Sequence, residues 1–181
     1  MNALILLADG FEVTEALATA DVLTRTHQID VTLCSITSSL TVSSSHGVKV
    51  SATKTLSQID VKDFDFLILP GGKLGVENLH ASQEVLALIR AFFSANKDVH
   101  AICAAPSILG DLGYLDGLDY TCFPGFQRGN GRYLHQGVVE TPHIITGHSM
   151  GFSLEFGKTI VRHYLGEKGL ERILPGIEGH E

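Results

Sequence analysis

Residues 64–72 read FDFLILPGG, a strongly apolar run that is stopped by Pro70 and two glycines. Continuous apolar residues without polar alternation are typical of a strand that is buried on both faces of a sheet. Proline cannot donate to a sheet ladder, and glycine accepts backbone angles that end a strand. The run therefore predicts a buried strand whose carboxyl end presents glycine amides.

Short apolar runs of this kind alternate along the chain with runs of helical spacing. The runs that predict strands are 3–7, 30–36, 64–69 and 99–102, with weaker candidates at 120–122, 138–140 and 144–146. The segments that predict helices are 13–23, the run capped by Ser82, 104–112 with Pro106 in its first turn, 152–164 ended by Gly166, and a further turn at 170–174. A hairpin is predicted around His46-Gly47. This alternation predicts an α/β fold, a three-layer sandwich with a mostly parallel sheet and helices on both faces.

Length and composition narrow the class of protein. The 181 residues correspond to one domain, and 44% hydrophobic with 18% charged residues excludes wholesale disorder. A net charge of −7 makes nucleic acid an unfavourable main partner. The first apolar run, 3–8, is too short to span a membrane, and no signal-peptide pattern precedes it. Three cysteines are too few for a disulfide framework, so we expect a cytoplasmic protein with reduced thiols.

Three of the predicted strands end in residues that can carry chemistry. Glu12 and Glu15 follow the first strand, Gly71 and Gly72 end the second, and Cys103 ends the third. Because parallel strands present their carboxyl ends at one edge of a sheet, we expect these residues to meet there.

Cys103 has the most informative setting of the three strand ends. The stretch AICAA at 101–105 passes from strand into helix with small residues around the cysteine, as the tight turn of a nucleophile elbow requires. A helix N-terminus favours a thiolate, so we expect a thiol pKa well below its ordinary value of about 8.5. The amides of Gly72 and Ala104 can together hold an oxyanion. The alternative is an inert core cysteine, which is common among free cysteines.

Glu15 stands beside this edge at the opening of the first predicted helix. A carboxylate there complements the helix dipole, which is the interpretation we prefer for Glu12. For Glu15 a sharper interpretation is available, because two anions cannot share a buried site cheaply. A carboxyl beside a thiolate is therefore expected to stay protonated and to donate a hydrogen bond to it.

Four stretches resemble the ThiJ/PfpI superfamily, in its branch around the parkinsonism-associated protein DJ-one. They are ALILLADGFEVTEA at 3–16, FDFLILPGGKLGVENL at 64–79, AICAAP at 101–106 and SLEFGKTIV at 153–161. They occur in order over nearly the whole chain. The resemblance implies a single domain over 1–181 with a flavodoxin-like fold. It also implies that Cys103 is the reactive cysteine, Glu15 its protonated partner, and Gly72 and Ala104 the oxyanion-binding amides.

The resemblance also carries functional expectations. It implies a homodimer and a stress-response role on small 2-oxoaldehydes or glycated groups, of the glutathione-independent glyoxalase or deglycase type. The alternative role is a redox sensor or chaperone whose Cys103 is oxidised to sulfinic acid. Protease-like members carry a histidine directly after the nucleophile, where this chain has Ala104, so peptidase activity is not expected. Several glyoxalase-active relatives carry a histidine where this chain has Phe123, which leaves proton transfer to Cys103, Glu15 or water.

The histidines give no further catalytic pattern. His100 is close to Cys103 in sequence, but strand alternation predicts a packed or hydrogen-bonded histidine instead of a catalytic one. His46, where the branch often has arginine, and His148 lie in predicted loops that can approach the site. None of the others has the spacing of a zinc site, and a flavodoxin-like topology alone does not establish flavin binding. We therefore predict neither a metal nor a cofactor.

Overall fold

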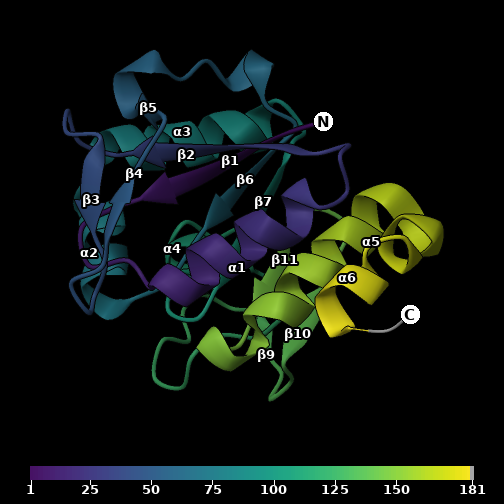
Figure 1. Ribbon diagram of the computed structural model, residues 1–181. Coiled ribbons are helices and arrows are strands. Elements are labelled where there is room, and N and C mark those ends of the chain that lie inside the picture. Colours follow the sequence, from purple (N-terminus) through teal and green to yellow (C-terminus); the bar gives the residue numbers. More distant parts are fainter. Residues whose placement is uncertain (180–181) are drawn as a thin grey trace.

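The computed structural model describes residues 1–179 and is built on a sheet of seven strands (Figure 1). In spatial order these are β10 (Val138–Glu140), β11 (Ile145–Gly147), β7 (Asp98–Ile102), β6 (Phe66–Leu69), β1 (Asn2–Leu7), β2 (Asp30–Ser35) and β5 (Lys54–Thr55). All neighbours are parallel except β10 and β11. Without the short edge strands β5 and β10, the order is the 2-1-3-4-5 order of flavodoxin-like folds. The predicted α/β class is confirmed.

Helices cover both faces of this sheet (Figure 1). On one face lie α1 (Val13–Thr24), α5 (Ser153–Glu171) and α6 (Leu174–Glu178); on the other lie α2 (Lys73–Ala81), α3 (Gln83–Ser94) and α4 (Pro106–Asp111). The buried side chains of β1 show why the sandwich forms. Leu4 and Leu6 enter the core beneath α2, α3 and α4, whereas Ile5 and Leu7 enter the core beneath α1 and α5. Both faces of the strand are apolar, so both must be covered.

Smaller elements lie outside the main sheet. A predicted hairpin is confirmed as β3 (Thr41–Ser43) and β4 (Lys49–Ser51), with Gly47 at a φ of 82° in its turn. The loop after β1 is bound to this hairpin, because Gly10 donates to the carbonyl of Ser43. The short strands β8 (Asp119–Tyr120) and β9 (Arg132–Tyr133) pair separately. Within residues 1–179 the structure also contains three 3₁₀ helices, over Leu56–Gln58, Val61–Asp63 and Met150–Phe152.

Two helix boundaries differ from those expected. The helix predicted over 104–112 begins only at Pro106, because the residues before it form the turn that leaves β7. Gly166 interrupts the helical geometry with a φ of 68° and a ψ of 179°, but helical residues resume and continue to Glu171. Ser82 caps α3 as predicted by accepting from the Val85 amide.

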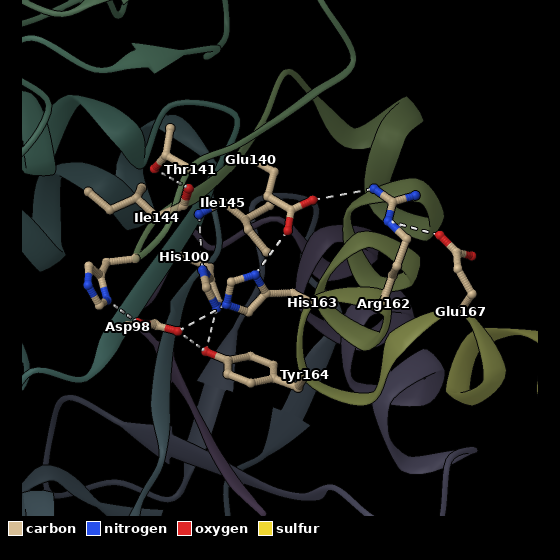
Figure 2. A network of polar contacts seen from close by, with 11 residues as sticks. Asp98, His100, Glu140, Thr141, Ile144, Ile145, Arg162, His163, Tyr164 and Glu167 are labelled. Carbon is tan, nitrogen blue, oxygen red and sulfur yellow. Dashed lines mark hydrogen bonds and ion pairs between the residues drawn. The ribbon is translucent and has the colours of Figure 1, made fainter.

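A polar network joins α5 to the sheet, as Figure 2 shows. The amide of Ile145 donates to Nδ1 of His100 (3.1 Å), so this ring carries its proton on Nε2 and donates to the Tyr164 hydroxyl (3.0 Å). Tyr164 in turn donates to Oδ2 of Asp98 (2.7 Å). His163 lies between Asp98 and Glu140, at 3.3 and 2.9 Å. His100 is thus a fully buried, hydrogen-bonded histidine, which confirms the interpretation from strand alternation.

We expect the free energy of unfolding to fall as the pH falls from about 6.5 toward 3. Burial lowers the pKa of His100 to about 3, so in this range the unfolded chain binds a proton that the folded chain does not. Burial acts to raise the pKa of Asp98, but hydrogen bonds from Tyr164 and His143 hold it below its usual value. Protonation of Asp98 therefore lowers the free energy of unfolding further at the most acidic pH values.

Urea unfolding at a series of pH values measures this effect. One extra proton bound by the unfolded chain corresponds to a slope of about 1.4 kcal/mol per pH unit. His100→Gln should reduce the slope of the free energy of unfolding against pH by the amount that corresponds to about one proton. His135→Gln, at an exposed position, should leave the slope unchanged. Equal slopes for wild type and His100→Gln would contradict the assignment.

Candidate active site

The carboxyl ends of β1, β6 and β7 meet at one edge of the sheet, as predicted. β6 is the parallel neighbour of both other strands, with Ile5 opposite Ile68 and Leu69 opposite Ala101. The loops that follow these strands carry Glu15, the two glycines and Cys103, and the fold therefore brings the predicted residues into one place.

Cys103 occupies a strained turn directly after β7. Its φ of 65° lies in the left-handed region, which non-glycine residues rarely adopt and which costs about 1–3 kcal/mol. The turn is fixed on both sides, because Cys103 donates its N–H to the carbonyl of Gly147 (2.8 Å) and its carbonyl accepts from the amide of Phe123 (2.7 Å). This is the sharp strand-to-helix turn that the small flanking residues indicate.

Glu15 is fully buried beside the thiol of Cys103. Its Oε2 accepts from the amide of Gly71 (2.7 Å), and within residues 1–179 its Oε1 has no hydrogen-bond partner of ordinary geometry. Burial raises the pKa of Glu15 to about 7, against hydrogen bonds from Cys103 and Gly71, and the charge of Glu12 adds to the rise. This carboxyl therefore keeps its proton to a much higher pH than an exposed glutamate does.

Gly71 belongs to the site as expected from its strand end, but its close contact with Glu15 and Cys103 is a role that the sequence analysis did not assign. A Cβ atom at this position would lie 2.6 Å from the Cβ of Cys103 and 2.6 Å from Oε2 of Glu15. The available signal was the pair of adjacent glycines. Gly72, with a φ of 89°, directs its N–H to the sulfur, and the N–H of Ala104 does the same. The structure thus brings Cys103, Glu15, Gly72 and Ala104 together.

The expectation of a lowered thiol pKa is wrong. Burial, together with the charge and hydrogen bond of the Glu15 carboxylate, raises the pKa of Cys103 to about 12, although the amides of Gly72 and Ala104 act to lower it. The helix that was expected to favour the thiolate begins only at Pro106. Thiol and carboxyl form one coupled pair, and because both pKa values are raised, the pair keeps one proton at and above neutral pH.

Cys103 and Glu15 line a pocket of about 310 Å³. Its lining residues are Glu12, Glu15, Gly72, Cys103, Phe123, Ser149, Met150 and Gly151. A second pocket of about 250 Å³, which shares Cys103 and Phe123 with the first, is lined by Lys73, Cys103, Ala104, Phe123 and Phe126. The other two cysteines, Cys34 and Cys122, are fully buried. Cys103 is therefore the cysteine that a small molecule can reach.

Histidines do not line either pocket within the described residues. The ring of His46 is mostly exposed, with Nδ1 3.9 Å from Oε2 of Glu12. His148 lies 3.3 Å from the hydroxyl of Thr121. A separate cavity of about 280 Å³, next to Phe93 and His143, contains none of the predicted site residues.

Metal sites and membrane spans are absent from the part of the chain that the structure describes. Within residues 1–179, no group of three or more histidine, cysteine or acidic side chains is placed to hold a metal ion. Over the same residues, no helix has both the length and the apolar character needed to cross a membrane.

Replacing Glu15 by glutamine should lower the pKa of the Cys103 thiol. The substitution removes the carboxylate charge that raises this pKa and keeps an amide that can donate to the sulfur. Thiolate absorbance against pH measures the change, with exposed Glu171→Gln as the matched control. A higher thiol pKa in Glu15→Gln would contradict this sign and mean that the native carboxyl donates to the thiolate.

Comparison with known proteins identifies a family for this chain. The family model described as the DJ-1/PfpI family matches residues 1–163. Protein DJ-1 homolog B from Arabidopsis thaliana is 33% identical over 93% of this chain, which spans 39% of that protein. A protein named deglycase from Pyrococcus horikoshii is 33% identical over 87 residues, 48% of this chain and 52% of that protein.

Solved structures give the same result over the full fold. The crystal structure of a cysteine-to-alanine mutant of a DJ-1 superfamily protein from Salmonella typhimurium superposes with a TM-score of 0.90. It is 33% identical, and the match covers 98% of this chain and 97% of that chain. The chain belongs to the DJ-1/PfpI family.

Proposed function

We propose that this chain is a cysteine-dependent stress-response protein that acts on small 2-oxoaldehydes, as a glutathione-independent glyoxalase or as a deglycase of glycated groups. One observation carries the proposal: the buried carboxyl of Glu15 and the thiol of Cys103 form a proton-sharing pair that opens onto a pocket, with two amides directed at the sulfur. The relative that is named a deglycase supports glycated groups as substrates.

The raised pKa values suggest how the thiol is activated. Glu15, as a carboxylate, accepts the thiol proton while the sulfur attacks the aldehyde carbon and a C–S bond forms. The negative charge moves to the former aldehyde oxygen, beside the amides of Gly72 and Ala104. Protonated Glu15 then returns the proton to this oxygen, which gives a neutral hemithioacetal. The thiolate with its protonated partner thus exists during attack and is not the resting state.

The second half-reaction uses the same carboxylate. Glu15 removes the proton from the aldehyde-derived carbon and passes it to the neighbouring ketone oxygen, which gives an enediol. The hydroxyl proton of the sulfur-bearing carbon then moves by way of Glu15 to the adjacent carbon, and a thioester forms. Water hydrolyses this thioester to a 2-hydroxy acid and the free thiol of Cys103. With a glycated group, the sulfur displaces the amine or thiol from this carbon: the C–S bond forms, the bond to the leaving group breaks, and Glu15 passes the thiol proton to the leaving group. Because no histidine among the described residues lines the pocket, these transfers fall to Cys103, Glu15 or water, and peptidase activity is not proposed.

The oligomeric state is part of the same proposal. We propose that residues 1–181 act as one domain and assemble as a homodimer in the cytoplasm, with the site near the interface. Exposed apolar side chains of Met150, Phe152 and Leu154 next to the pocket support an interface there.

Cys103→Ser should lower the rate of methylglyoxal conversion to lactate by about two orders of magnitude or more, because the hydroxyl is a much weaker nucleophile. Lactate formation and circular dichroism of the same samples separate lost chemistry from lost fold. Cys34→Ala, at a buried cysteine outside the site, is the matched control and should keep its turnover. Wild-type turnover in Cys103→Ser would rule out the proposed reaction through the Cys103 thiol.

One observation favours a second function. Cys103 lines a pocket, whereas the other two cysteines of the chain are fully buried. In a redox sensor or chaperone, the sulfur of Cys103 attacks hydrogen peroxide, an S–O bond forms and water leaves. A second peroxide converts the sulfenic acid to sulfinic acid. The amides of Gly72 and Ala104 are placed to stabilise the acidic product.

Under mild peroxide treatment, Cys103 should gain oxygen before Cys34 and Cys122, because peroxide reaches its sulfur through the pocket. Mass spectrometry of the peptides that contain each cysteine follows the order of oxidation. Simultaneous oxidation of all three cysteines would remove the basis of the sensor function, whatever the result of the turnover assay.

A further inference from the structure

The charged residues that line the pocket of about 310 Å³ are all acidic. Glu12 and Glu15 line it, and no lysine or arginine within residues 1–179 does so. The rest of the wall includes the half-exposed apolar side chains of Phe123 and Met150. Lys73, in the adjoining pocket, is exposed at the start of α2, where water hydrates its charge.

Glu12 is held in place by backbone and side-chain contacts. It precedes α1 as the capping residue, and its Oε1 accepts from the amide of Thr14 (3.4 Å). Its Oε2 accepts from the hydroxyl of Ser45 (3.1 Å), and its own amide donates to the carbonyl of Gly71 (2.9 Å). The side chain of Glu12 is only 17% exposed. A fixed, poorly hydrated carboxylate acts on a neighbouring charge more strongly than a surface glutamate.

The nearest basic side chain does not cancel this charge. His46 lies 3.9 Å from Glu12, but its side chain is 80% exposed, and its Nδ1 is also 2.9 Å from the hydroxyl of Ser45. The influence of Glu12 reaches the reacting groups, since its charge contributes to the raised pKa of Glu15. An anion that entered the pocket would meet the same field.

We propose that Glu12 is a specificity-determining residue that makes the site select uncharged carbonyl compounds and reject those that carry a carboxylate. The inference rests on the proposed function, because it concerns the substrates of the Cys103 site. The substrate class is then the uncharged 2-oxoaldehydes, of which methylglyoxal is the simplest with an apolar group. Glyoxylate, an aldehyde of similar size with a carboxylate, belongs to the rejected class.

A pair of reagents of nearly equal size isolates the effect of charge. In both iodoacetamide and iodoacetate the sulfur displaces iodide, but only the second carries a carboxylate. The quantity to compare is the rate of alkylation of Cys103 by iodoacetamide divided by its rate with iodoacetate, both measured by mass spectrometry. This ratio cancels any change in the amount of thiolate. For wild type this ratio should exceed that of 2-mercaptoethanol. Glu12→Gln keeps an oxygen that accepts from the amide of Thr14 and gains an NH2 group that can donate to the hydroxyl of Ser45. This substitution should lower the ratio about 3- to 10-fold.

Glu84→Gln is the matched control, because Glu84 is an exposed carboxylate in the first turn of α3, and it should leave the ratio unchanged. Methylglyoxal should also slow alkylation of wild-type Cys103 by iodoacetamide at lower concentration than glyoxylate, and Glu12→Gln should narrow this difference.

The outcomes separate the inference from the proposed function. If Cys103 is alkylated but Glu12→Gln keeps the wild-type ratio, or if Glu84→Gln changes it equally, the role of Glu12 is overturned while the thiol site stands. A preference of the wild-type protein for iodoacetate would also overturn the role of Glu12. It would mean that the charge of Lys73 dominates the electrostatic field at Cys103. If neither reagent modifies Cys103, the proposed thiol chemistry fails, and the inference fails with it.

Discussion

The positive φ of Cys103 is the constraint on which the site depends. An L-residue adopts this conformation only where its surroundings compensate about 1–3 kcal/mol of strain. Two hydrogen bonds supply part of that compensation, one to Gly147 at the end of β11 and one from Phe123. Since β11 must lie beside β7 for the first of these bonds, the turn exists only in the completed sheet. Elements that hold β11 in place, including the contacts of α5 with it, therefore also position the sulfur.

A second constraint brings the carboxyl to this sulfur. The loops after β1 and β6 pack backbone against backbone, so closely that a Cβ at Gly72 would lie 2.3 Å from the carbonyl oxygen of Gly10. At Gly75 it would lie 2.7 Å from the backbone of Phe11. The glycines in these loops allow α1 to start close to the end of β6, which sets Glu15 beside Gly71 and Cys103. The same close approach buries the carboxyl, and this burial is the main cause of its raised pKa.

Features encoded in short segments could be predicted from the sequence, whereas those that depend on burial could not. The apolar runs and the strand alternation at His100 report local periodicity, and Ser82 is a local capping signal, so the sheet, the packed histidine and the cap were all accessible. The convergence of Glu15, Gly72, Cys103 and Ala104 followed from parallel strands. The direction of the thiol pKa was not accessible, because it depends on desolvation, which a helix terminus in the sequence does not report. The contact of Gly71 with Glu15 was not accessible either, because close approach between loops is a tertiary property.

The shared proton explains how a thiol and two carboxylates can occupy one small pocket. Above about pH 7 the pair of Cys103 and Glu15 carries one negative charge, and the amides of Gly72 and Ala104 stabilise it on sulfur while the amide of Gly71 stabilises it on the carboxyl. Glu12 disfavours charge on the carboxyl and so favours the arrangement in which the sulfur is the anion. A neutral aldehyde can take this charge onto its oxygen without adding another. An anionic compound would place a third negative charge beside Glu12 and the pair. Activation of the thiol and selection by charge are therefore consequences of the same unneutralised carboxylates.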